Sequence, residues 1–151
     1  MKSFIHALAG IRKAVKTEKN MRIHISVMIM VFYFARFYGL TSQRYVLLVV
    51  FCGLVIALEM VNTAVEYVVD ILSPEYHEKA KIAKDIAAGA VMVVAALSVW
   101  GGIMLFWDLN VFSTIIEKFK TDILELIVAA AFVIILGLFI IFFKEGKNGE
   151  K

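Results

Sequence analysis

The sequence predicts an all-α membrane protein in which a short amphipathic helix precedes four membrane-spanning helices. Hydrophobic residues make up 62% of the 151 residues and charged residues 19%, and the mean hydropathy is +0.85. Soluble domains do not have this composition. Four apolar runs are long enough to cross about 30 Å of hydrocarbon. These runs extend over approximately residues 23–40, 45–70, 85–107 and 122–143.

The first segment, residues 3–19, has the pattern of a surface helix. Phe4, Leu8, Ile11 and Val15 follow one another at spacings of four, three and four residues, and lysines and an arginine occupy the other faces. Such a helix lies in the membrane surface with its apolar face toward the lipid. An ordinary helix packed on the bundle has the same pattern. We expect residues 108–121 to form an outer loop and residues 144–151 a charged tail.

The distribution of basic residues predicts the orientation of the chain. Four Lys and Arg residues lie beside the span ends on one side, and the other twelve lie on the side that carries the N-terminus. Basic residues concentrate on the cytoplasmic side of membrane proteins. We therefore expect a plasma-membrane protein with both termini in the cytoplasm. The net charge of +3 describes a basic inner face, so a nucleic acid is not an expected partner.

A polar stripe interrupts the second span. On a helix, Glu59, Asn62, Glu66 and Asp70 fall within an arc of roughly 80°. An ionised side chain at membrane depth costs about 2.5 kcal/mol or more, so such residues usually face a protein interior or a water-filled cavity and mark a functional site. The alternative is a stripe that only holds helices together.

The chemistry of these residues points to phosphoryl transfer. Mg²⁺ commonly takes one or two carboxylates together with phosphate oxygens, and Glu66 with Glu18 could supply such a pair. Glu59 lies deeper, where a carboxylate can act as a general base on an alcohol. Lys84 could neutralise a transferring phosphoryl group. Because the soluble kinase motifs are absent, we expect transfer to a membrane lipid hydroxyl by another kind of kinase.

The connection between the second and third spans contains a helix-start signal. Ser73 is a good N-cap residue, and Pro74 suits the first helical position. The pattern predicts a helix that begins at Pro74 and continues into the third span.

Two segments resemble the prokaryotic integral-membrane diacylglycerol kinase family. They are Glu59-x-x-Asn62-Thr-Ala-x-Glu66-x-x-x-Asp70, and Tyr76-His77 followed by Lys84-Asp85-x-Ala-Ala88-Gly-Ala-Val91. Upstream, Gly10-Ile-Arg12 and Glu18-x-Asn20-x-Arg22-x-His24 are similar to the same family, and particularly to its undecaprenol kinase branch. The resemblance implies that residues 1–107 form a lipid kinase domain.

The resemblance also implies a mechanism and an assembly. It implies an ATP-dependent, Mg²⁺-dependent enzyme that works as a homotrimer of three-span protomers with shared active sites at the cytoplasmic interface. It gives the role of general base to Glu59, with Asn62 beside the reacting centre, and the role of metal ligands to Glu18 and Glu66. It implies nucleotide contacts at Asp70, Glu75, Tyr76, His77, Lys84, Asp85 and His6, and lipid contacts at Arg12 and Ala88.

Three departures from the family pattern affect the expected substrate and fold. His6 stands where the enterobacterial enzymes have a tyrosine, and Ala88 stands where they have a serine, which favours undecaprenol over diacylglycerol as the acceptor. The fourth span exceeds the usual three. A small proton-coupled transporter, with Glu59 as its titrating carboxylate, and a catalytically inactive relative are the alternatives from other classes.

Overall fold

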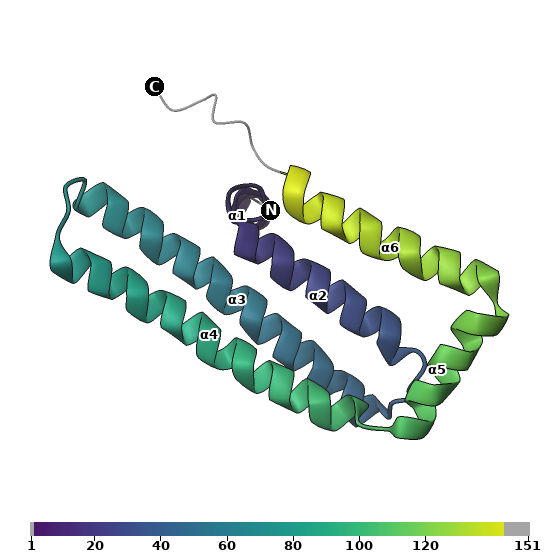
Figure 1. Ribbon diagram of the computed structural model, residues 1–151. Coiled ribbons are helices and arrows are strands. Elements are labelled where there is room, and N and C mark those ends of the chain that lie inside the picture. Colours follow the sequence, from purple (N-terminus) through teal and green to yellow (C-terminus); the bar gives the residue numbers. More distant parts are fainter. Residues whose placement is uncertain (1, 144–151) are drawn as a thin grey trace.

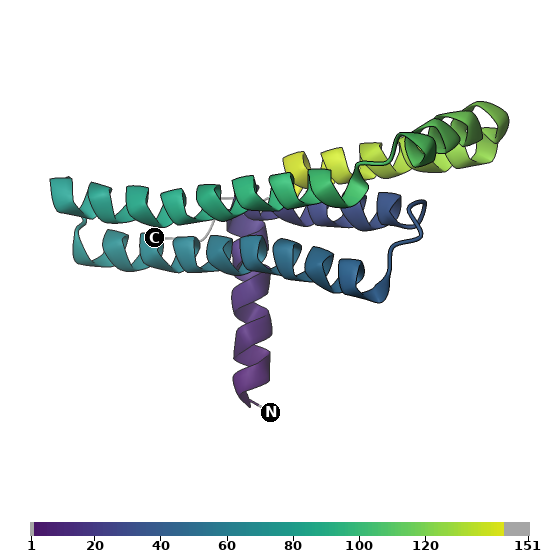
Figure 2. The same cartoon turned by 90° about the horizontal axis from the view of Figure 1, so that it is seen from below.

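The computed structural model describes residues 2–143, and this part of the chain folds into six helices without a strand (Figure 1). The predicted all-α fold is confirmed. The long helices α2, α3, α4 and α6 lie side by side, whereas α1 runs perpendicular to them (Figure 2). The helices are α1 (Lys2–Thr17), α2 (Lys19–Ala35), α3 (Ser42–Leu72), α4 (Glu78–Phe106), α5 (Leu109–Thr121) and α6 (Ile123–Phe142).

Within residues 2–143, three helices are long and apolar enough to cross a membrane: α3, α4 and α6. Helix α2 has 17 residues, about 26 Å, and ends at Ala35, five residues before the end of the predicted first span. The chain leaves the helix in a turn that contains Gly39, whose φ is +51°. A glycine accepts this left-handed conformation without steric cost, so the chain can turn at Gly39 toward α3.

Helices α3 and α4 form the most extensive pair in the fold. Gly101 of α4 faces Phe51 of α3 so closely that an added Cβ would lie 2.5 Å from the Phe51 ring. The Ser98 hydroxyl donates a hydrogen bond to the Phe51 carbonyl at 3.4 Å. With 31 residues, α3 is about 46 Å long and exceeds the hydrocarbon thickness. One end of the pair therefore extends past α2 (Figure 1).

The predicted helix start at Pro74 is wrong. Ser73 ends α3 instead, with its N–H bonded to the Val69 carbonyl at 2.9 Å. Helix α4 begins at Glu78, and His77 is its N-cap: the His77 Nδ1 atom accepts from the Lys79 N–H at 3.2 Å. The Ser73 hydroxyl donates to the Glu75 carbonyl, so it stabilises the connecting turn rather than the start of a helix.

Residues 108–121, expected as a loop, form helix α5 after a short break at Asp108. The Asp108 carboxylate accepts hydrogen bonds from the N–H groups of Asn110 and Val111 and caps the helix. Phe112, Ile115 and Phe119 follow at helical spacing and give α5 an apolar face. The mixed charge of the segment concealed this pattern. The charged tail expected at 144–151 lies outside the described residues.

Candidate active site

The centre of the site is Glu59, whose residue is only 2% exposed although it carries a carboxylate. The turn between α1 and α2 and the first turns of α2 face it. The Asn20 side chain lies near the Glu59 carboxylate, and the His24 Nε2 atom lies 4.0 Å from Glu59 Oε2. Glu18 and Glu66 lie close enough to repel the charge of Glu59. We name Glu18, Asn20, His24, Glu59, Asn62 and Glu66 the carboxylate cluster.

Asn62 lies one turn after Glu59 on α3 and contacts Glu66. Its Nδ2 atom donates to Glu66 Oε1 at 2.9 Å, and its residue is 6% exposed. Its Oδ1 atom is buried and has no hydrogen-bond partner among the described residues. A buried acceptor without a partner costs about 1–3 kcal/mol, so such an atom usually has a role. It offers an open oxygen to a cation or a donor beside Glu66.

The donor set of the cluster fits a magnesium ion. In the part of the chain that the structure describes, no three His, Cys, Asp or Glu side chains form a complete metal site. Mg²⁺ does not need one, because it keeps waters and substrate phosphate oxygens and takes only one or two protein carboxylates. Glu18 and Glu66 bring two carboxylates toward Glu59 from different parts of the chain, and the open Asn62 oxygen lies beside one of them.

A pocket of about 300 Å³ lies where α3 ends and α4 begins. This volume is at the lower limit for small-molecule sites. Lys84 forms an ion pair with Asp70 at its wall. Five of the residues that we expected to contact nucleotide line this pocket: Asp70, Glu75, Tyr76, His77 and Lys84. Asp85 follows Lys84 on α4, is exposed, and does not line the pocket.

Three other expected site residues lie elsewhere in the single chain. His6 and Arg12 are exposed on α1, and Ala88 is exposed on α4. Figure 2 shows that the N-terminal part of α1 extends away from α3 and α4. The structure thus gathers the three acids in one cluster and five of the expected nucleotide residues in a separate pocket, and it leaves Asp85, His6, Arg12 and Ala88 outside both.

The sequence reasoning assigned no role to Asn20 and His24. Both lie beside Glu59, and they are four residues apart on α2, the spacing that puts two side chains on one helix face. This spacing was the available signal. His24 also lies on a second cavity, of about 560 Å³, which α2, α3 and α4 line almost entirely with apolar side chains such as Val31, Leu48 and Phe106.

A helical fold with three helices long and apolar enough to cross a membrane, a buried carboxylate and a separate polar pocket fits the class of membrane phosphotransferases. The comparisons with known proteins agree with this class. The family model of the prokaryotic diacylglycerol kinases matches residues 5–106. The chain therefore belongs to the prokaryotic diacylglycerol kinase family and is a lipid kinase.

Similar proteins include both named activities of this family. The undecaprenol kinase of Bacillus subtilis is 36% identical over 105 residues, which cover 70% of this chain and 85% of that protein. The diacylglycerol kinase of Synechocystis is 43% identical over 105 residues, or 68% of this chain and 60% of that protein. The diacylglycerol kinase of Haemophilus influenzae is 34% identical, covering 67% and 87%. No solved structure matches the chain.

Proposed function

We propose that this protein transfers the γ-phosphoryl group of ATP to undecaprenol, with Mg²⁺ bound by Glu18 and Glu66 and Glu59 as the general base. The observation that carries the proposal is the burial of Glu59 among Asn20, His24 and two further carboxylates. Removing a carboxylate from water is unfavourable in free energy, so a buried acid in this setting indicates a functional role.

The proposed reaction uses Glu59 to accept the proton of the lipid hydroxyl. The hydroxyl oxygen forms a bond to the γ-phosphorus as the bond to the bridging oxygen breaks, and ADP leaves. Asn20 and His24 lie beside the Glu59 carboxylate and would orient it. Glu18 and Glu66 would hold Mg²⁺, which would neutralise charge on the phosphate groups. Lys84, at the wall of the pocket between α3 and α4, would bind a phosphate oxygen after exchanging its partner Asp70.

The proposal of undecaprenol as the acceptor rests on the apolar cavity beside His24 and on the similar proteins. The 560 Å³ cavity begins beside His24, 4.0 Å from Glu59, and its apolar lining suits a hydrocarbon chain attached to the reacting alcohol. One relative is an undecaprenol kinase and others are diacylglycerol kinases. Ala88, in place of the serine of the enterobacterial enzymes, favours undecaprenol, and diacylglycerol is the alternative acceptor.

The test is a competition assay in mixed micelles, with γ-labelled ATP and equal mole fractions of undecaprenol and diacylglycerol. We expect label in undecaprenyl phosphate before phosphatidic acid. Preferential labelling of phosphatidic acid would assign the alternative acceptor. Label in neither lipid would contradict the proposed function.

We also propose a homotrimer with both termini in the cytoplasm and α1 in the membrane surface. The apolar side chains of α1 support the surface position, because Phe4, Ile5 and Leu8 are at least half exposed and need a lipid or protein partner. Native mass spectrometry from detergent tests the stoichiometry. Labelling of single cysteines placed in the tail and at Ser42 tests the orientation from the two sides of the membrane.

A further inference from the structure

Arg22, at the start of α2, is a buried charge that the proposed reaction does not use. Its residue is 4% exposed. A buried guanidinium must be hydrogen-bonded to be tolerated. Its Nε atom donates to the Ile140 carbonyl at 3.1 Å, and its Nη1 atom donates to the carbonyls of Val15 and Lys16 at 2.9 Å and 3.1 Å. The first carbonyl belongs to α6 and the other two belong to α1.

All three carbonyls lie in the last turn of a helix, since α1 ends at Thr17 and α6 ends at Phe142. The last four carbonyls of a helix have no partner within it, and the helix dipole favours a cation there. The planar fork of an arginine can serve several such acceptors at once. One side chain therefore caps the C-terminal ends of two helices that are more than a hundred residues apart in the chain.

The turn between α1 and α2, which the Arg22 hydrogen bonds hold together, carries two members of the carboxylate cluster, Glu18 and Asn20. Only Glu18 separates α1 from α2. Its N–H donates to the Ala14 carbonyl at 2.8 Å, and its carbonyl accepts from the Arg22 N–H at 3.4 Å. The Arg22 side chain then joins α2 back to Val15 and Lys16. The turn that presents Glu18 and Asn20 to Glu59 is thus fixed on both sides.

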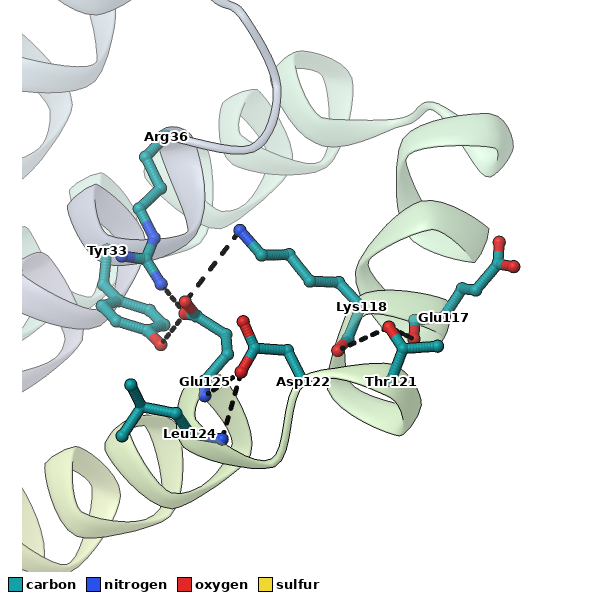
Figure 3. Close-up of polar contacts among 8 residues, drawn as sticks. All are labelled: Tyr33, Arg36, Glu117, Lys118, Thr121, Asp122, Leu124 and Glu125. Carbon is teal, nitrogen blue, oxygen red and sulfur yellow. Dashed lines mark hydrogen bonds and ion pairs between the residues drawn. The ribbon is translucent and has the colours of Figure 1, made fainter.

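Helix α6 is held on α2 at its other end as well (Figure 3). The Glu125 carboxylate accepts a hydrogen bond from the Tyr33 hydroxyl at 2.9 Å and forms an ion pair with Arg36. The Phe132 ring stacks on Tyr33 with 5.0 Å between the centroids. We name Tyr33, Arg36, Lys118 and Glu125 the outer anchor. With α6 fixed here, its last turn is held beside Arg22.

We propose that Arg22 is a positioning residue for the carboxylate cluster and that α6 holds the Arg22 guanidinium in place. Helix α6 lies outside residues 5–106, which the family model matches, so the proposed support comes from a helix beyond the matched region. The consequence for catalysis rests on the proposed function. The structural coupling from α6 to the turn at Glu18 does not.

Hydrogen exchange of the full chain in detergent, followed by mass spectrometry of peptides that cover residues 17–23, tests the coupling. Arg22→Met removes the three hydrogen bonds, and Phe132→Ala loosens α6 without touching the turn. We expect faster exchange at 17–23 in both variants, more in the first. Arg22→Lys should recover part of the protection. The matched control is Ile135→Ala, because Ile135 is 61% exposed on the same helix and should leave exchange unchanged.

The activity readout is the dependence of lipid phosphorylation on Mg²⁺ concentration. In Phe132→Ala, displacement of Glu18 should raise the Mg²⁺ concentration for half-maximal rate severalfold. Saturating Mg²⁺ should then restore most of kcat. Loss of folded protein would instead lower kcat and leave the Mg²⁺ requirement unchanged. Unchanged exchange at 17–23 in Phe132→Ala would overturn the role of α6, and the same result in Arg22→Met would overturn the role of Arg22. Altered exchange in a chain that phosphorylates no lipid would support the coupling and contradict only the proposed function.

Discussion

Helix α2 contributes to two polar clusters, one at each end, and they differ in their balance of charge. In the outer anchor, one carboxylate meets two cations and a phenol: Glu125 contacts Arg36, Tyr33 and, at 4.0 Å, Lys118. The carboxylate cluster at the other end combines three acids with one histidine and two amides. The first is satisfied by the chain itself. The second has an excess of negative charge that a cation from outside can neutralise.

The aromatic residues of α2 and the cations of the outer anchor strengthen this contrast. The Arg36 guanidinium lies 4.0 Å from the Tyr33 ring centroid, and the Lys118 amine lies 5.2 Å from that of Phe37. Cation–π contacts of this kind add about 0.5–1 kcal/mol at exposed sites. The carboxylate cluster instead leaves the buried Asn62 oxygen without a partner in the described part of the chain. From this difference we infer that the outer anchor contributes mainly to stability, and it supports the proposed chemical role of the carboxylate cluster.

The largest expected effect is that of Glu59→Gln. If Glu59 accepts the proton of the lipid hydroxyl, its amide should lower kcat at least about a hundredfold and leave ATP binding near normal. Phosphorylation assays in micelles and calorimetric titration with a non-hydrolysable nucleotide measure the two quantities. Glu117→Gln, on the exposed face of α5, is the matched control. Near-normal turnover in Glu59→Gln would remove this residue from the role of base.

Substitution of the proposed metal ligands should have a different signature. Glu18→Gln and Glu66→Gln should each raise the Mg²⁺ concentration for half-maximal activity by at least about tenfold, the scale on which even the outer partners of metal ligands act. The measurement is a Mg²⁺ titration of the rate at saturating lipid. A lower kcat with an unchanged Mg²⁺ requirement in both variants would argue against a shared metal and weaken the contrast between the two clusters.

A smaller effect is expected for the pocket between α3 and α4. Lys84→Gln removes the amine that pairs with Asp70 and should raise the KM for ATP severalfold while the KM for lipid stays the same. Lys79→Gln is the matched control, since Lys79 is exposed near the start of the same helix and does not line the pocket. Equal effects of the two substitutions would mean that the pocket only contributes positive charge to the inner face.

Periodicity and composition were sufficient to predict the helical membrane fold and the shared face of the α3 carboxylates. Glu59, Asn62 and Glu66 lie in a span whose length is fixed by its apolar run, so their common face follows from helix geometry alone. Glu18 was joined to the α3 acids by magnesium chemistry and by the family resemblance rather than by periodicity, because contacts between helices depend on packing that no local pattern encodes.

Other features could not be predicted for identifiable reasons. Helix α5 depends on the Asp108 cap and on a face of three apolar residues, and the charged residues of the segment masked this pattern. Helix α2 ends at Ala35, within a run that remains largely apolar, and a turn that contains Gly39 follows it. The contact of Arg22 with the Ile140 carbonyl joins positions 118 residues apart, so neither end of the sequence indicates the other.

The smallest effect on activity, and the clearest on stability, is expected for Glu125→Gln. The new amide oxygen can still accept from Tyr33 but loses the ion pairs, so α6 should stay on α2 while the free energy of unfolding falls by about 1–2 kcal/mol. Thermal unfolding in detergent should show a Tm lower by a few degrees, with kcat near that of the wild type. Arg36 would keep its contacts with Tyr33 and Phe37, which limits the loss. A large fall in kcat without a fall in Tm would place Glu125 in the chemistry, and the distinction between the two ends of α2 would then fail.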